Sequence, residues 1–295
     1  MRGYFFAIAA TAIWSGNFII ARGLSDNIPP VSLAFWRWAV AIIVLLPFAL
    51  RPLLNERHIL KKHIRYLSVT ALLGITVFNT LIYIAGHTTS ALNLSLISIT
   101  FPIFIILLMR IFYRELITVK KRIGVSLVAA GVVVLITQGD PSILLDVSFA
   151  IGDVCMLVAA ITFAIYSIQL KRKPKELSIW ALQLSTFLLG LLFLLPFFIW
   201  ESMVSPAVQW EMTTLVSILY VGIFASLTAF VLWNKAIIVI GPAKAGMVYY
   251  TLPLFSGVLA YLFLQERISS LHFFSAAFIL SGILVANNDK TKEGN

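Results

Sequence analysis

The 295-residue chain carries one pattern of residues twice. Four residues recur 151 positions later: Thr100, Pro102, Glu115 and Gly131 return as Thr251, Pro253, Glu266 and Gly282. Two more recur at a separation of 148: Gly74 and Thr80 return as Gly222 and Thr228. Self-similarity at a fixed offset indicates a duplicated structural unit. The fold must therefore be built from two copies of one unit.

Each copy consists of five apolar segments. Hydrophobic residues make up 60% of the chain and charged residues only 12%, about half the charge of a soluble domain. Segments of roughly 20 apolar residues are long enough to cross a bilayer as helices. We expect helices at residues 3–22, 31–50, 66–85, 90–110, 121–137, 149–170, 178–199, 213–234, 244–263 and 269–287.

The odd number of segments in each copy inserts the second copy upside down relative to the first. The expected fold is an all-α membrane protein of ten transmembrane helices, arranged as two inverted five-helix repeats around a central cavity. We assign the repeats to residues 1–137 and 149–287, an outer linker to 138–148 and a cytoplasmic tail to 288–295.

Positive charge is distributed unevenly along this pattern. The net charge is +10, and with both termini cytoplasmic all of the 22 Lys and Arg residues lie on the inner side except Arg22, Arg37 and Arg267. This bias follows the positive-inside rule. It predicts a multi-pass protein of the cell inner membrane, whose partners are the lipid bilayer and a small-molecule substrate, and not nucleic acid.

Tryptophan residues fall mostly at the ends of the expected helices. This position is typical of an aromatic belt at the membrane interfaces, and it is expected for Trp36, Trp38, Trp180, Trp200, Trp210 and Trp233. Trp14 is different, because it lies in the middle of the first span. Asn17 follows three residues later, so both side chains project from nearly the same helix face.

Proline interrupts the fourth helix of each copy. Pro102 and Pro253 cannot donate a backbone hydrogen bond and clash with the carbonyl four residues earlier, which belongs to Ser98 and Tyr249 respectively. Paired broken helices in inverted repeats are typical of secondary transporters. We expect the two prolines to act as hinges during alternating access; the alternative is a passive kink.

Uncharged polar and aromatic residues within the spans are candidates for binding a substrate, because such residues usually face the bundle interior. The candidates are Trp14, Asn17, Asn79, Tyr83 and Tyr250. Ring faces with amide and hydroxyl groups suit a zwitterion that has an apolar side chain, or a planar organic cation. The alternative is that these groups only hold helices together.

Arg37 and Asp153 are the charges well inside the spans, at similar expected depth. We expect an ion pair that serves as a structural tie or an outer gate, while an Arg facing the cavity could instead hold a substrate carboxylate. No carboxylate lies near the expected midplane, so strong proton coupling is not expected. The sequence shows no catalytic constellation, metal-ligand spacing or cofactor motif, and we expect neither an enzyme nor a bound cofactor.

Three motifs carry a family resemblance. Ala9-Ala10 precedes Trp14-Ser15-Gly16-Asn17, a Phe-Trp-Arg-Trp run around Arg37 opens the second helix, and both copies hold Pro-x(12)-Glu followed by Gly. With these motifs the chain resembles the EamA-type ten-helix exporters of the drug/metabolite transporter superfamily, most of all the bacterial aromatic amino acid exporters. The resemblance implies that helices 5 and 10 are peripheral and that Trp14, Asn17, Tyr83, Tyr250 and the two prolines line or hinge the pathway.

The expected function is therefore a secondary transporter that exports neutral or aromatic amino acids and related metabolites across the inner membrane, as a monomer or weak homodimer. A sugar-phosphate or nucleotide-sugar exchanger is the first alternative, although it would need more cavity cations than Arg37 and Lys244. A polytopic enzyme acting on lipids is the second, although the loops lack its usual acidic or histidine clusters.

Overall fold

A computed structural model describes residues 1–24, 27–89, 94, 97–98, 100–137, 140, 142, 150–264 and 270–287. These residues are helical with short connections and include no β-strand, which confirms the predicted all-α class. The elements are α1 (Arg2–Gly23), α2 (Pro30–Asn55), α3 (Arg57–Lys62), α4 (Ile64–Ala71), η1 (Leu72–Val77), α5 (Phe78–Thr88), α7 (Phe101–Tyr113), α8 (Val119–Thr137), α9 (Ile151–Leu170), α10 (Ile179–Val204), α11 (Met212–Tyr220), η3 (Val221–Thr228), α12 (Ala229–Tyr249), α13 (Leu252–Leu264) and α14 (Ser270–Asn287).

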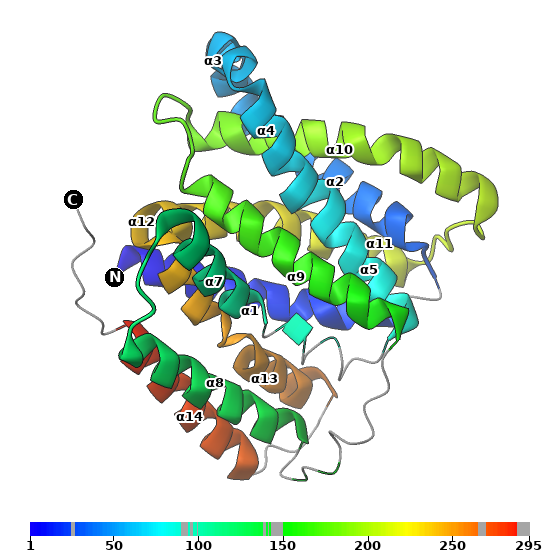
Figure 1. The fold of residues 1–295 in the computed structure, drawn as a ribbon. Coiled ribbons are helices and arrows are strands. Elements are labelled where there is room, and N and C mark those ends of the chain that lie inside the picture. Colours follow the sequence, from blue (N-terminus) through cyan, green and yellow to red (C-terminus); the bar gives the residue numbers. More distant parts are fainter. Residues whose placement is uncertain are drawn as a thin grey trace.

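Membrane-spanning length is reached by several continuous helical stretches (Figure 1). Within the described residues, the stretches long and apolar enough to cross a bilayer are Pro30–Asn55, Ile64–Thr88, Ile151–Leu170, Ile179–Val204 and Met212–Tyr249. Apolar side chains cover their outer surfaces, including Ile43, Phe48, Leu192 and Phe197. An exposed apolar surface of this kind is unsuited to water and matches a lipid environment.

The third span of each repeat contains a π-helical segment. The segments are η1 and η3, which begin near the repeated glycines Gly74 and Gly222. In each span, a side chain donates to a backbone carbonyl five residues earlier: Asn79 Nδ2 to Gly74 O at 3.0 Å, and Thr228 Oγ1 to Ile223 O at 2.9 Å. Such π segments are rare and concentrate at functional positions.

The eighth and ninth spans meet without a loop. Sequence patterning placed a connection between residues 234 and 244, but the helical hydrogen bonding continues through α12 and breaks only at Gly241, with φ 77° and ψ 161°. Glycine tolerates this positive φ because it has no Cβ. Pro242 follows at once and starts the next helical turn, so the expected loop is replaced by a sharp kink.

The two repeats contact each other through equivalent residues. α2 packs along α10, where the rings of Trp38 and Phe187 lie 4.6 Å apart. The two helices share a Leu-Leu-Pro-Phe run, with Pro47 and Pro196 at a separation of 149. At the same separation Trp38 corresponds to Phe187, so this contact joins a residue to its own counterpart.

α8 and α14, which are the fifth helices of the two repeats, form a separate pair at the lower edge of the bundle (Figure 1). Ser275 Oγ donates to Gly131 O at 2.7 Å. A Cβ on Gly124 would lie 2.5 Å from Gly282 O, and one on Gly282 would lie 2.6 Å from Gly124 O. Small residues permit such close helix packing in membranes. We call this pair the α8–α14 seam.

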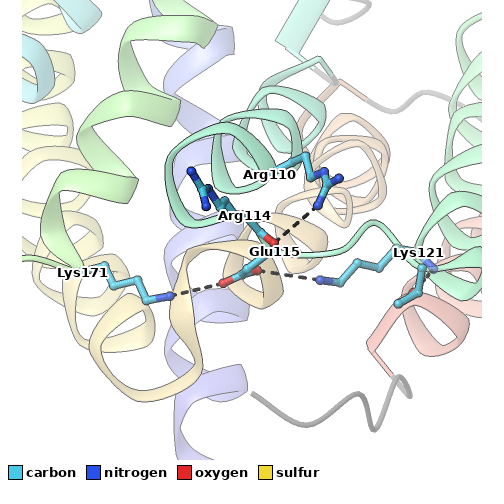
Figure 2. A network of polar contacts seen from close by, with 6 residues as sticks. Arg110, Arg114, Glu115, Lys121 and Lys171 are labelled. Carbon is cyan, nitrogen blue, oxygen red and sulfur yellow. Dashed lines mark hydrogen bonds and ion pairs between the residues drawn. The ribbon is translucent and has the colours of Figure 1, made fainter. Parts of the chain in front are cut away.

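Glu115 connects three helix ends at the end of the bundle where α1 begins. Figure 2 shows its carboxylate between Lys171, at 3.2 Å, and Lys121, at 3.9 Å. Arg114, at the C-terminal end of α7, adopts a left-handed conformation with φ 54°. Because these side chains are partly exposed, each ion pair adds little stability. Glu266, the counterpart of Glu115, lies outside the described residues.

Candidate functional site

The centre of the bundle is filled by aromatic side chains around Trp14. The Trp14 ring lies 5.3 to 6.2 Å from the rings of four residues on α9 and α12: Phe163, Phe230, Trp233 and Tyr249. These five residues, with Phe101, are called the aromatic cluster. The Trp14 indole Nε1 donates to Ala225 O, in η3, at 2.9 Å. Trp14 is thus fixed in the interior, as expected from sequence.

Trp38 and Trp233 do not belong to the aromatic belt that was expected at the membrane interfaces. Both indoles are fully buried. Trp233 Nε1 donates to Ser167 Oγ at 3.1 Å. By contrast, Trp180, Trp200 and Trp210 are exposed, as a belt requires. The position of a tryptophan near a helix end therefore does not distinguish an indole that faces lipid from an indole that is buried in the core.

Arg37 is the centre of a buried polar cluster. Its Nη1 donates to Tyr83 Oη at 2.5 Å and its Nε donates to Ser226 Oγ, in η3, at 2.6 Å. Tyr83 Oη donates in turn to Asn17 Oδ1 at 3.1 Å. We call Asn17, Arg37, Tyr83 and Ser226 the Arg37 cluster. It joins the first three spans of one repeat to the third span of the other.

The Arg37 guanidinium is only 1% exposed, and its Nη2 has no hydrogen-bond partner. Its other close neighbours are the rings of Trp38 and Tyr83, 5.1 and 5.5 Å from Cζ. Hydroxyl oxygens and ring faces stabilise a cation less than a carboxylate does. The cluster therefore holds a buried positive charge and an unused donor, which together suit an anionic group of a ligand.

Asp153 does not supply that anion. Its Oδ2 accepts from the Ala150 backbone N–H at 2.6 Å, and its Oδ1 accepts from Thr89 Oγ1. Asp153 is the third residue of α9, where a carboxylate satisfies free backbone donors and complements the helix dipole. The ion pair expected between Arg37 and Asp153 is therefore replaced by separate sets of partners.

The polar side chains of the third span fall into two groups. Tyr83 joins the Arg37 cluster, whereas Asn79 is used by the π segment η1. Thr76 Oγ1 donates to Gly190 O at 2.9 Å, and Thr80 Oγ1 donates to Thr76 O at 2.6 Å. These three bonds hold helices together or bond within one helix. The structure thus favours a structural role for Asn79 over the expected substrate contact.

Of the two adjacent tyrosines at the second break, only Tyr249 faces the aromatic cluster. Tyr250 packs in a second core with residues of the α8–α14 seam: Val128, Val132, Ile279 and Ala286. Its hydroxyl is buried without a hydrogen-bond partner. The structure therefore places Tyr250, which was expected to line the pathway, away from Trp14, Asn17 and Tyr83.

Both prolyl breaks are built in the same way. Pro102 and Pro253 are each the second residue of a helix, α7 and α13. Thr100 donates from both N and Oγ1 to Ile97 O, at 3.0 and 2.6 Å. Thr251 donates in the same way to Val248 O, at 2.9 and 2.8 Å. Most of the first half of the fourth span, residues 90–99, lies outside the described part.

Sequence reasoning missed a second buried polar cluster, formed by Tyr166, Gln183 and Asn234. Tyr166 Oη donates to Asn234 Oδ1 at 2.8 Å, and Asn234 Nδ2 donates to Gln183 Oε1 at 2.7 Å. We call these three residues the Gln183 cluster. An amide residue within an apolar span is itself a signal of function or of helix pairing. Sequence reasoning considered only positions near the expected midplane, so it did not select Gln183 or Asn234.

Comparison with known proteins identifies the family. The sequence profile described as the EamA-like transporter family matches residues 1–137 and 150–288. The chain belongs to this family. Its members are ten-helix membrane transporters, which agrees with the all-α fold. A solved crystal structure with 17% sequence identity superposes with a TM-score of 0.76, covering 97% of this chain and 96% of the other.

Several EamA relatives align along nearly the whole chain. A protein of Archaeoglobus fulgidus, named an uncharacterized transporter, is 28% identical over 258 residues, or 86% of each chain. Uncharacterized transporter YetK of Bacillus subtilis is 26% identical and covers 97% of this chain and 86% of its own. An Escherichia coli protein named "Probable amino-acid metabolite efflux pump" is 23% identical, covering 95% and 92%.

Proposed function

We propose that this EamA transporter is a secondary carrier that exports neutral or aromatic amino acids and related metabolites across the inner membrane, with both termini cytoplasmic. The observation that carries the proposal is the buried Arg37 guanidinium, which has an unused Nη2 donor and no carboxylate partner. A substrate carboxylate would supply the missing acceptor and neutralise the charge. The name of the E. coli relative supports the same substrate class.

The surroundings of Arg37 favour a substrate that also has an apolar portion. Trp14 lies one helical turn from Asn17 and carries the aromatic cluster beside it. Ring edges and faces provide apolar contact and attract a substrate ammonium group. An amino acid with a large neutral side chain matches these features together.

A phosphorylated sugar matches less well. Among the side chains that the structure describes, Arg37 is the only Lys or Arg that is buried. A phosphate dianion in a low-dielectric site calls for more than one cation. The charge count therefore favours a monoanionic or zwitterionic substrate over the exchangers considered as an alternative.

The closed core supports a mechanism of alternating access. The aromatic cluster is packed between the two polar clusters, and Trp14 is only 6% exposed. A substrate can pass only if these rings separate, and the paired breaks at Pro102 and Pro253 are the places where two helices can bend. Buried Asp153 caps a helix, which supports a carrier without strong proton coupling.

Uptake into proteoliposomes tests the proposal. Purified protein is reconstituted, and the uptake of labelled phenylalanine and leucine is measured with and without an imposed pH gradient. Saturable uptake that is indifferent to the gradient and to excess glucose 6-phosphate is expected. Uptake driven by the gradient would contradict the uncoupled mechanism, and competition by the sugar phosphate without any amino acid uptake would favour the exchanger.

A further inference from the structure

The Gln183 cluster forms a directed chain of hydrogen bonds. Tyr166 donates to Asn234 Oδ1, and Asn234 presents its Nδ2 to Gln183 Oε1. With Tyr166 as the donor, turning over the Gln183 amide alone would place two donors face to face. The chain of bonds therefore ends in Gln183 Nε2, which is a donor.

This terminal donor has no partner. Gln183 is fully buried, and its Nε2 makes no hydrogen bond. A buried donor without an acceptor costs about 1–3 kcal/mol, so a group of this kind calls for an explanation in function. It needs an oxygen acceptor, such as a carboxylate or carbonyl.

The Gln183 cluster and the Arg37 cluster lie toward opposite ends of the bundle. Lys235, next to Asn234, lies over the ring of Phe6 near the start of α1, with Nζ 5.8 Å from the ring centroid. Asn17, which belongs to the Arg37 cluster, follows Phe6 by about 16 Å along α1. The two clusters therefore face the two sides of the membrane.

Aromatic rings connect the two clusters. Tyr166 lies 5.5 Å from Phe163 and 5.9 Å from Phe230, and both of these rings contact Trp14. Asn17 lies one turn beyond Trp14 on α1. A continuous row of polar, aromatic and again polar groups thus crosses the bundle, with an unused donor in each polar cluster: Arg37 Nη2 in one, Gln183 Nε2 in the other.

We infer that Gln183 is a second, uncharged binding subsite for the carboxylate of the transported amino acid, on the side of the membrane where α1 begins. The inference rests on the proposed function and extends it. Gln183 and Arg37 lie on the second spans of the two repeats, α10 and α2, three residues apart in the register that relates Trp38 to Phe187. The two subsites therefore receive the carboxylate from opposite sides. A charged donor binds a carboxylate roughly twice as strongly as a neutral one, so the Gln183 subsite is the weaker of the two.

Substitutions at Gln183 test the subsite. Gln183→Glu replaces the free donor with a negative charge. Gln183→Met removes the donor, together with the Oε1 acceptor, and puts an uncharged apolar side chain of similar length in its place. Thr186→Val is the matched control, because Thr186 lies one turn along α10 and its hydroxyl bonds only to carbonyls of its own helix. Uptake of labelled phenylalanine is measured in inverted and in right-side-out membrane vesicles.

The half-saturating phenylalanine concentration of Gln183→Met is expected to rise about 2- to 10-fold in inverted vesicles, as for one lost hydrogen bond. In right-side-out vesicles, which present the Arg37 side, the half-saturating concentration of Gln183→Met is expected to rise less. Thr186→Val is expected to show no rise in either vesicle type. Because Gln183→Met adds no charge, it decides the question if Gln183→Glu fails to fold.

Two failures are distinguishable. Saturable uptake by the wild type, with the same half-saturation in the Gln183 variants as in Thr186→Val, would overturn the subsite alone. An absence of phenylalanine and leucine uptake by the wild type in both vesicle types would overturn the proposed function and the subsite with it.

Discussion

Thr100 and Thr251, 151 positions apart, make the same two hydrogen bonds at the two prolyl breaks. Each closes a tight turn from its backbone N–H and its hydroxyl to the carbonyl three residues earlier. Pro102 and Pro253 follow two residues later in the same register. The breaks are thus equivalent local structures, one in each repeat, and we expect them to bend in equivalent ways.

Replacing either proline is expected to slow transport without preventing folding. Alanine restores the backbone N–H and removes the ring clash, so a straight helix becomes more favourable by up to about 3 kcal/mol. Initial rates of labelled phenylalanine exchange should fall several-fold in Pro102→Ala and in Pro253→Ala. Pro52→Ala is the control, because Pro52 lies within α2 and has no proline counterpart. Wild-type rates in both variants would exclude the hinges.

Arg37→Met is expected to weaken substrate binding while leaving stability intact. The substitution removes charge-assisted hydrogen bonds worth about 1.5–3 kcal/mol, so half-saturation should rise on the order of tenfold or more. It also removes a buried charge that lacks a carboxylate, which is often neutral or stabilising. Transport assays and thermal unfolding in detergent measure the two effects. Exposed Arg110→Met is the control, and unchanged half-saturation in Arg37→Met would refute the role of Arg37.

Gly282→Ala is expected to destabilise the α8–α14 seam. The new Cβ would lie 2.6 Å from Gly124 O and 2.9 Å from Val128 N, which are backbone atoms that cannot rotate away. Overpacking of this kind costs about 1–3 kcal/mol. Gly246→Ala is the control, since its Cβ would first meet the end of the flexible Ile105 side chain at 3.0 Å. An equal unfolding temperature for both variants would show that α8 and α14 accommodate the added methyl group without loss of stability.

Asp153→Asn is expected to lower stability and to leave coupling unchanged. The amide keeps one acceptor oxygen but loses the negative charge at the start of α9, a change worth about 0.5–2 kcal/mol. Thermal unfolding measures the first effect, with exposed Glu211→Gln as the control. Uptake under an imposed pH gradient measures the second, and a gradient response that disappears in the variant would identify Asp153 as a proton carrier.

Sequence patterning predicted the spans and the breaks because both depend on local chemistry. Apolar length alone marks a membrane helix, and a proline acts on the carbonyl four residues earlier wherever it stands. The capping role of Asp153 is local too. Its partners differ from the expected ion pair because Asp153 lies in the first turn of α9, which begins at Ile151 and not at residue 149.

Partners across helices could not be read from sequence. Tyr249 and Tyr250 are adjacent, yet one faces the aromatic cluster and the other faces the seam, because successive residues on a helix point about 100° apart. The Gln183 cluster needs three helices in a particular rotation about their axes. The unused donor of Arg37 likewise becomes visible only when all of its neighbours are in place.

The α8–α14 seam has a geometric consequence for the transport cycle. At the separation of 151, Gly131 corresponds to Gly282 and Gly124 corresponds to Ser275, so the Ser275–Gly131 contact and the Gly124–Gly282 contact are images of each other. The seam therefore straddles the approximate two-fold axis. If the two repeats exchange conformations to turn the carrier from one side to the other, whatever lies on that axis maps onto itself. The seam, like the Trp38–Phe187 contact, then stays in place while the remaining helices of the two repeats exchange their conformations.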